Sequence, residues 1–142
     1  MFDDVITLFI KYEDKKNKIC QWHSKVISNV ELQKNNAIAV SKDGNKSNDN
    51  VKLHIPCKDA VIGEYEYLKP KEWYKAADKA DKITLKEGDF FVDGEVSDLD
   101  IYEDSQYQNG LFSYMKTNFD DVYVISSVDR YKTIPHFEVG GH

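Results

Sequence analysis

The sequence predicts a mainly β fold, namely a small antiparallel β-barrel or sandwich with one or two short helices. Several short segments alternate apolar and polar residues, which is the pattern of half-buried strands. Aromatic residues make up 13% of the 142 residues, with nine Tyr and seven Phe, and such rings favour strands. No repeating strand, helix, strand order is present, so a parallel sheet is not expected. The length fits a single domain over residues 1–142.

The first half of the chain is expected to contain three strands. Apolar residues alternate with polar ones from Asp4 in DVITLFIKYED, and the polar turn KKNK follows. The segment 19–32 is β-branched and aromatic, and it predicts a second strand or two strands that meet near Asn29. The segment VKLHIPC, residues 51–57, predicts the third strand, with Lys52 and His54 facing outward. Its inward residues are Val51, Leu53, Ile55 and Cys57.

The segment SKDGNKSNDN, residues 41–50, has no apolar side chain, and we expect a mobile loop there. Oxygen-bearing side chains stand at every second position, as in a calcium loop. They belong to Asp43, Asn45, Ser47 and Asp49. The Gly and Glu that complete a calcium loop are missing, so a solvated loop is the better reading. A short apolar piece, AIAV at 37–40, precedes it.

Two helices are expected in the second half. A helical insertion is predicted near 68–82, because Pro70 suits the first position of a helix. A second helix is predicted at 109–119, where Leu111, Met115 and Phe119 recur every four residues.

The remaining segments predict strands. ITLKEGDFFVDGEV is read as two strand segments with turns at Glu87-Gly88 and Asp93-Gly94. The last two strands, 121–128 and 133–139, are expected to be joined by a turn at 129–132.

The hairpin expected at Asp93-Gly94 raises a packing question. Phe90 and Phe91 are adjacent in one strand, so their rings must face opposite sides. Both sides cannot face the inside of a barrel, and one ring is therefore expected near the surface. A large exposed apolar group of this kind marks an interface.

Charge and composition restrict the function. The chain carries 25 acidic and 19 basic residues, a net charge of −6, which disfavours sequence-independent binding to phosphates. No apolar run is long enough to span a bilayer, and no membrane association is expected. Two cysteines make no disulfide framework, so free thiols in a reducing compartment are expected.

One mirrored set of residues could bind a metal ion in principle. Cys20 precedes His23 by three residues, and His54 precedes Cys57 by three. Residues three apart on a strand face opposite sides, so the set is not expected to converge and no metal is predicted. The serines lie in no nucleophile-elbow setting and no Gly-rich phosphate loop is present. The paired carboxylates Asp3-Asp4 and Asp120-Asp121 are explained by capping and solvation, so neither a cofactor nor enzymatic activity is expected.

The order of these elements is similar to a known class of proteins. Five segments carry the likeness, in this order: ITLFIKYED, ICQWHSKVISNVEL, VKLHIP, GDFFVDGEV and the closing YVISSVDRYKTIPHFEVGGH. Together they resemble the head-completion proteins of tailed bacteriophages and prophages, also called head-closure, stopper or head-tail connector proteins. In that family a small β-barrel is typical, a Gly-Asp and Gly hairpin precedes the last strands, and the chain often ends in a strand like HFEV. The likeness spans most of the chain, apart from the inserted helices.

The resemblance implies a structural protein of the virion neck, made in the bacterial host cytoplasm. Its partners would be copies of itself in a ring, a portal or adaptor protein, and a tail-terminator or tail-tube protein, with DNA passing nearby without specific binding. An acidic chain suits such a channel because it repels phosphates. A tail terminator of the same neck and a small cytoplasmic β-barrel binding module remain as alternatives.

The contact residues follow from these expectations. The loop residues Asp43 to Asn50, Phe91, and the terminal strand from His136 to Gly141 are predicted to meet a partner. Within the terminal strand we single out His136, Phe137 and Val139, because an exposed last strand can lend its edge to a neighbour's sheet. Deleting residues 135–142 is then expected to leave a folded domain.

Overall fold

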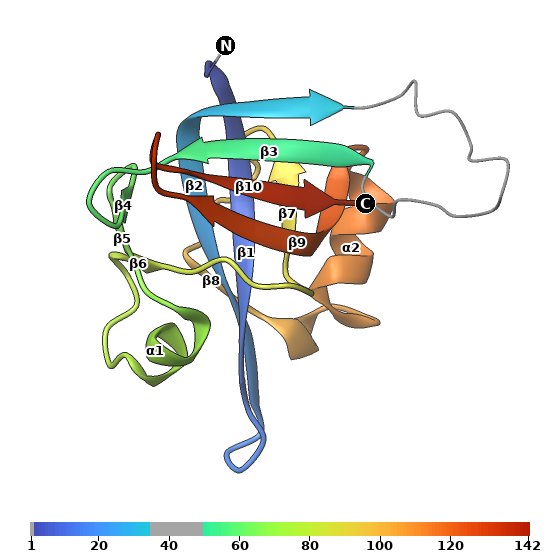
Figure 1. The fold of residues 1–142 in the computed structure, drawn as a ribbon. Helices are drawn as coiled ribbons and strands as arrows, with labels where there is room; N and C mark the ends of the chain where they lie inside the picture. Colours follow the sequence, from blue (N-terminus) through green and yellow to red (C-terminus); the bar gives the residue numbers. More distant parts are fainter. Residues whose placement is uncertain (1, 35–49) are drawn as a thin grey trace, which may run out of the picture.

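The structure is a computed structural model that describes residues 2–34 and 50–142. Six antiparallel strands form a closed barrel (Figure 1). Around the barrel they are β1 (Asp4–Asp14), β7 (Phe90–Asp93), β9 (Val122–Tyr131), β10 (His136–Gly141), β3 (Val51–Pro56) and β2 (Ile19–Lys34). Pairing of β2 with β1 closes the ring of strands. The predicted fold class is confirmed as a β-barrel.

The other elements decorate the barrel. β8 (Ile101–Glu103) pairs with β2 on the outside, and β4 (Val61–Ile62), β5 (Tyr65–Tyr67) and β6 (Lys82–Ile83) form a small separate sheet. The helices are α1 (Pro70–Lys75), the 3-10 turn η1 (Asp104–Gln106) and α2 (Gly110–Asn118). Both predicted helices are confirmed, with shorter bounds. None of the described helices is long and apolar enough to cross a bilayer.

Within the barrel, β2 pairs with both β1 and β3 because it bends. Asn29 adopts a left-handed φ of 59°, and the register with β1 shifts between Asp4 and Val5. Such a bulge turns the strand, so residues up to Val30 pair with β1 while residues Glu31–Lys34 pair with β3. The predicted break near Asn29 is therefore a β-bulge within one continuous strand.

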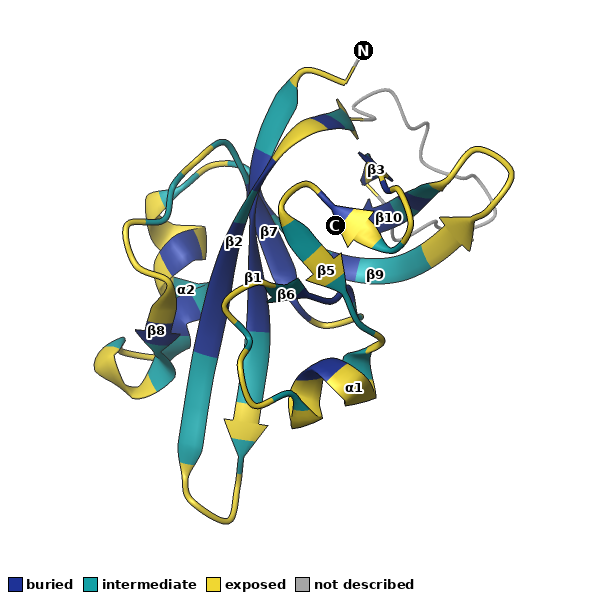
Figure 2. Cartoon of the chain, turned by 90° about the vertical axis from the view of Figure 1, so that its left-hand side faces the viewer, coloured by how far each residue is buried: buried dark blue, intermediate teal, exposed yellow. Residues whose placement is uncertain are grey.

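The barrel interior is the main core. Side chains of alternate positions from all six strands fill it, and Trp73 of α1 packs into the same cluster. The inward set predicted for 51–57 is confirmed, because Val51, Leu53, Ile55 and Cys57 are all buried. Figure 2 shows the buried stretches in the middle of β1 and β2 and along β7.

A second core lies on the outer face of the barrel wall, beneath α2. Leu111 and Met115 of that helix pack there with residues of β1, β2, β7 and β8. Phe91 belongs to the barrel interior, whereas Phe90 belongs to this outer core, and both rings are 0% exposed. The expectation that one ring lies near the surface is wrong, because α2 covers the outer face of β7.

The hairpin expected at Asp93-Gly94 is also absent. After Asp93 the chain leaves the sheet, and β7 pairs with β1 and β9 instead of with the residues that follow it. Gly94, at φ 101°, donates its N–H to the carbonyl of Val5 at 2.8 Å. Buried Thr7 secures this turn: its hydroxyl donates to the Gly94 carbonyl at 2.7 Å and accepts from the Val96 N–H at 3.1 Å.

We expect Thr7→Val to lower the free energy of unfolding by about 1–3 kcal/mol, because it keeps the shape but leaves a carbonyl and an N–H without their partner. Thr7→Ser keeps the hydroxyl and is the matched control. Urea unfolding of both variants measures the difference. Equal losses in the two variants would contradict the role assigned to the hydroxyl.

The C-terminal strand is central. β10 pairs along its length with β3 on one side and with β9 on the other. The turn that joins β9 to β10 comprises residues 132–135, three residues later than predicted. A Cβ atom on Gly141 would lie 3.3 Å from the ring of Phe91, so glycine permits this close crossing.

Candidate functional site

The predicted contact residues fall into three groups. Asp43, Asn45, Ser47 and Asp49 lie outside the described residues. Phe91, Phe137 and Val139 are buried at 1% exposure or less, so their side chains belong to the core and cannot form a contact surface. His136 is half-buried on the outer face of the barrel. The prediction of an interface through Phe91, Phe137 and Val139 is therefore wrong.

The proposed strand edge is not available either. Both edges of β10 are hydrogen-bonded within the barrel, so the strand has no row of unpaired groups to offer a neighbour. The expectation rested on its being the last strand. In the closed barrel β10 lies between β3 and β9, so the expected free edge is paired.

The set Cys20, His23, His54 and Cys57 does not form one site. Cys57 packs into the barrel interior, whereas His54 lies half-buried on the opposite, outward face of the same segment. Cys20 and His23 lie on β2, outside its pairing with β3. Among the described residues, the side chains close enough to share a metal ion are instead His54, His136 and Glu138.

The most prominent surface feature is the hairpin of β1 and β2. β1 pairs with β7 only over Ile6–Phe9, and β2 pairs with β8 only over Gln21–His23. Beyond these positions the two strands pair with each other as far as Asp14 and Ile19. The result is a two-stranded ribbon, residues 13–20, that projects from the barrel (Figure 1).

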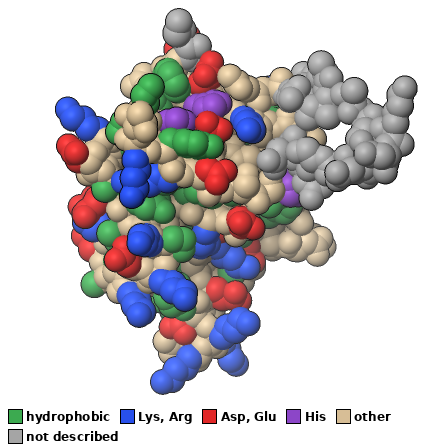
Figure 3. All heavy atoms as spheres, viewed as in Figure 1, with side chains coloured by type: hydrophobic (Ala, Val, Ile, Leu, Met, Phe, Trp, Pro, Cys, Tyr) green, Lys and Arg blue, Asp and Glu red, His purple; other side chains and the backbone are tan. Residues whose placement is uncertain are grey.

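The tip of this ribbon is basic. Lys15, Lys16 and Lys18 are exposed there, and Figure 3 shows lysines gathered at that end of the molecule. Asp14 organises the turn by accepting from the N–H groups of Lys16 and Asn17. The chain as a whole is acidic, so the ribbon concentrates positive charge on a protein of net charge −6.

Contacts with α1 brace the ribbon. The rings of Tyr12 and Tyr74 lie 4.9 Å apart, and the Tyr74 hydroxyl donates to the carbonyl of Glu13 at 2.5 Å. Lys79 places its ammonium 4.7 Å from the ring centre of Tyr12. An isolated two-stranded ribbon is marginally stable, and these contacts hold its base in place.

Exposed apolar side chains mark two further places. Leu99 and Ile101 are 53% and 45% exposed beside β8, whose other edge has no strand partner among the described residues. Tyr131 and Ile134 are exposed at the β9–β10 turn, with Ile134 at 76%. The exposure of Ile134 was not predicted, because residues 133–139 were read as a strand.

A cleft of about 490 Å³ opens between β2 and residues 77–80. Buried Lys25 donates from Nζ to the carbonyls of Lys79 and Ala80, each at 2.8 Å. Burial lowers the pKa of Lys25. Because its ammonium is hydrogen-bonded to these carbonyls, Lys25 holds residues 79–80 in place and is not available as a reactive amine.

His23 lies beside this cleft, 8% exposed, with its ring 5.3 Å from that of Trp73. Burial, together with the charges of Lys25 and Lys79, lowers the pKa of His23 from 6.5 to about 4. Elsewhere, Asp89 is buried and accepts from Lys86 Nζ at 2.6 and 2.7 Å. Burial outweighs that ion pair and raises the pKa of Asp89 from 3.8 to about 6.

These two groups give opposite pH dependences. Between pH 6.5 and 4 the unfolded chain protonates His23 and the folded chain does not, so acidification lowers stability. Between pH 6 and 3.8 the folded chain binds the Asp89 proton more tightly, so acidification raises stability. Each effect is worth about 3 kcal/mol at most, and in the native protein they largely cancel.

We therefore expect His23→Gln to make the protein gain stability relative to wild type as the pH falls from 6.5 to 4, and Asp89→Asn to make it lose stability. Chemical unfolding at each pH, plotted as the difference from wild type, isolates the two groups. Parallel curves for all three proteins would contradict both assignments.

Comparison with models of protein families identifies the family of this chain. A family model described as a family of unknown function, DUF6751, matches residues 1–142. No curated protein matches the chain. No solved structure matches it either. Because the family model covers the whole sequence, the chain belongs to the DUF6751 family.

Proposed function

We propose that this protein is a neck component of a tailed bacteriophage or prophage particle, in the head-closure position. Identical subunits assemble as a ring between the portal and the tail, and DNA passes through the ring without specific binding. The protein acts by assembly and has no enzymatic role. The resemblance of its element order to head-completion proteins motivates this proposal.

The projecting β1–β2 ribbon is the observation that supports it most. The six barrel strands are paired on both edges, so addition of a strand to the barrel is not available for assembly. A ribbon that extends beyond a small domain gains its full stability when a second surface supports it. In a ring, that surface is the next subunit or the portal.

Charge supplies complementary patches. The ribbon tip carries Lys15, Lys16 and Lys18, whereas the segment 98–104 around β8 is acidic and has exposed Leu99 and Ile101. A basic patch and an acidic, partly apolar patch on one chain suit head-to-tail packing, which closes into a ring when the rotation fits.

Co-assembly with portal rings tests the proposal. Purified full-length protein is mixed with portal rings of the same phage, and occupancy is counted by electron microscopy. We expect ring-shaped extra density on the portal. A combined Lys15→Glu, Lys16→Glu and Lys18→Glu variant should reduce occupancy at least about tenfold, since several charged contacts are reversed.

The matched control makes the same change of charge at exposed lysines outside the ribbon, Lys58, Lys116 and Lys132. It should co-assemble like wild type. Binding to tail-tube protein but not to portals would favour the tail-terminator alternative. A protein that stays monomeric with every neck partner would overturn the proposal and favour a small binding module.

A further inference from the structure

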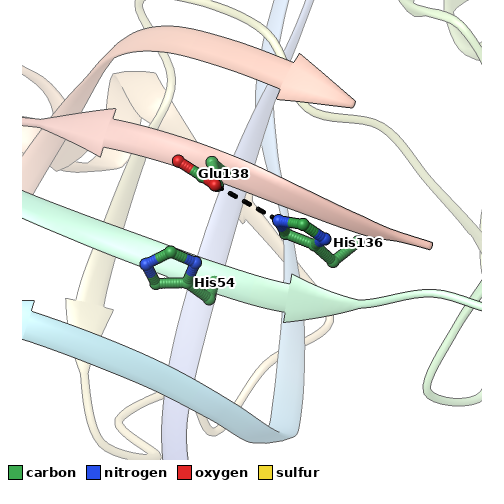
Figure 4. A group of neighbouring side chains, drawn as sticks. All are labelled: His54, His136 and Glu138. Atoms are coloured by element: carbon green, nitrogen blue, oxygen red, sulfur yellow. Dashed lines mark hydrogen bonds and ion pairs between the residues drawn. The ribbon is translucent and has the colours of Figure 1, made fainter. Parts of the chain in front are cut away.

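We propose that His54, His136 and Glu138 form a binding site for a divalent transition-metal ion of the zinc class on the outer face of the barrel (Figure 4). The ligand atoms of the three side chains all lie within 4.8 Å of one another. The site is independent of the proposed neck assembly.

The strand register creates this group. β3 and β10 pair so that His54 stands directly opposite Glu138. His136 lies two residues from Glu138 on the same strand, and side chains two apart face the same side. Two imidazoles and one carboxylate therefore converge from two adjacent strands, although His54 and His136 are 82 positions apart in the sequence.

His136 is held ready to bind through one nitrogen. A carbonyl oxygen can only accept, so the 2.7 Å contact with Ile134 means that His136 Nδ1 carries the hydrogen. Histidines that ligate metals characteristically donate their other ring N–H to a carbonyl or carboxylate. The ring also stacks on Tyr131, with centroids 4.9 Å apart and planes 8° apart. Its Nε2 is thereby aimed at Glu138, and because a carboxylate accepts, Nε2 donates to it until a metal ion replaces that proton.

The distances suit a small ion. His136 Nε2 lies 3.2 Å from Glu138 Oε2. Ligand atoms around a tetrahedral zinc ion, bonded at about 2 Å, stand about 3.3 Å apart, so this pair already has the required spacing. His54 completes the set after a shift of at most about 1.5 Å, within the reach of a side-chain rotation.

Charge around the group favours a cation. The cross-strand row on this face runs from Glu31 through His54 and Glu138 to Asp129, because each is the register partner of the next. Glu138 and Asp129 are like charges directly opposite each other, which destabilises a sheet unless a cation lies nearby. Lys52 is the nearby cation, but its ammonium is 3.7 Å from Glu138 and mostly exposed, so a metal ion displaces it at little cost.

The ligand chemistry selects the metal. Imidazole nitrogen suits zinc, copper and nickel, whereas magnesium and calcium prefer sites built only from oxygen. Three protein ligands leave the fourth tetrahedral position open to water or to a group from a bound partner.

Metal titration of the tag-free, full-length protein tests the site. Isothermal titration with ZnCl₂ should show one saturable site per chain, and MgCl₂ should not compete. Zinc binding should weaken at least about tenfold in each of the variants His54→Gln, His136→Gln and Glu138→Gln. The reason is that removing a metal ligand should cost at least as much affinity as removing a residue that only supports a ligand. All three side chains face outward, and circular dichroism confirms that each variant is folded.

Cys20→Ser, Cys57→Ser and His23→Gln are the matched controls and should bind zinc like wild type. In wild type, NMR signals of the His54 and His136 rings should shift on zinc addition while those of His23 stay unchanged. Absence of saturable binding would overturn the proposal. So would binding that the cysteine variants abolish and the Glu138 variant retains.

Discussion

Removing residues 136–142 is expected to unfold the whole domain. β10 lies between β3 and β9, and its loss would open the barrel and leave two strand edges unpaired. Phe137 and Val139 would leave the interior, at about 1.5–3 kcal/mol for each buried side chain. With the ladder hydrogen bonds lost as well, the cost exceeds the roughly 5–15 kcal/mol that stabilises a typical domain.

Circular dichroism and two-dimensional NMR of the truncated chain test this result. Deletion of His142 alone is the control, because it removes only one pair of backbone bonds, to Val124. That variant should stay folded. Dispersed amide signals from the truncated chain would show that the domain folds without β10. That result would contradict the central role assigned to β10 and support the earlier expectation that the last strand is dispensable for folding.

Phe90→Ala and Phe91→Ala are each expected to cost about 3–5 kcal/mol, as for other buried aromatic residues. Both rings are 0% exposed although they are neighbours in sequence, because each occupies a different core. A strand with one side facing water would show one large and one small loss. Urea unfolding of the two single variants distinguishes these outcomes.

A double-mutant cycle tests the separation of the two cores. Phe112 of α2 lies 5.2 Å from Phe90, ring centre to ring centre, so these two substitutions should couple by about 0.5–3 kcal/mol. Phe91 packs in the barrel interior, so Phe91→Ala and Phe112→Ala should add within about 0.5 kcal/mol. Equal coupling for both pairs would mean that the two clusters form one core.

The zinc site and the ribbon lie on different parts of the molecule and rest on different observations. The proposal for the ribbon rests on its projection beyond the barrel and on its exposed lysines. The proposal for the metal site rests on strand register and on hydrogen bonding. A failed portal assembly would leave the zinc titration unaffected. A failed titration would leave the neck proposal unaffected.

Local patterns predicted much of the fold because they depend on neighbouring residues alone. The alternation in 51–57 placed Val51, Leu53 and Ile55 inside and His54 outside, as the structure has them. The four-residue spacing of Leu111 and Met115 predicted α2 and its buried face. Asn29 marked the bend of β2. Each of these features follows from the geometry of a single strand or helix.

Long-range pairing accounts for the errors. The alternation of side chains along a strand requires that Phe90 and Phe91 face opposite sides. Only the packing of α2 against β7 shields the outer side from water. The final position of β10 in the chain suggested a free edge, yet the barrel closes around it. The pattern of a single strand carries no information about what covers its far side.

The candidate metal group shows the same division. The sequence alone determined that His54 faces outward in one strand and that His136 and Glu138 share one face of another. Only the tertiary structure decided that β3 and β10 are neighbours in the register that joins them. The physical reason is that side-chain direction is a property of two successive residues, whereas strand pairing depends on the burial gained when distant parts of the chain close one barrel.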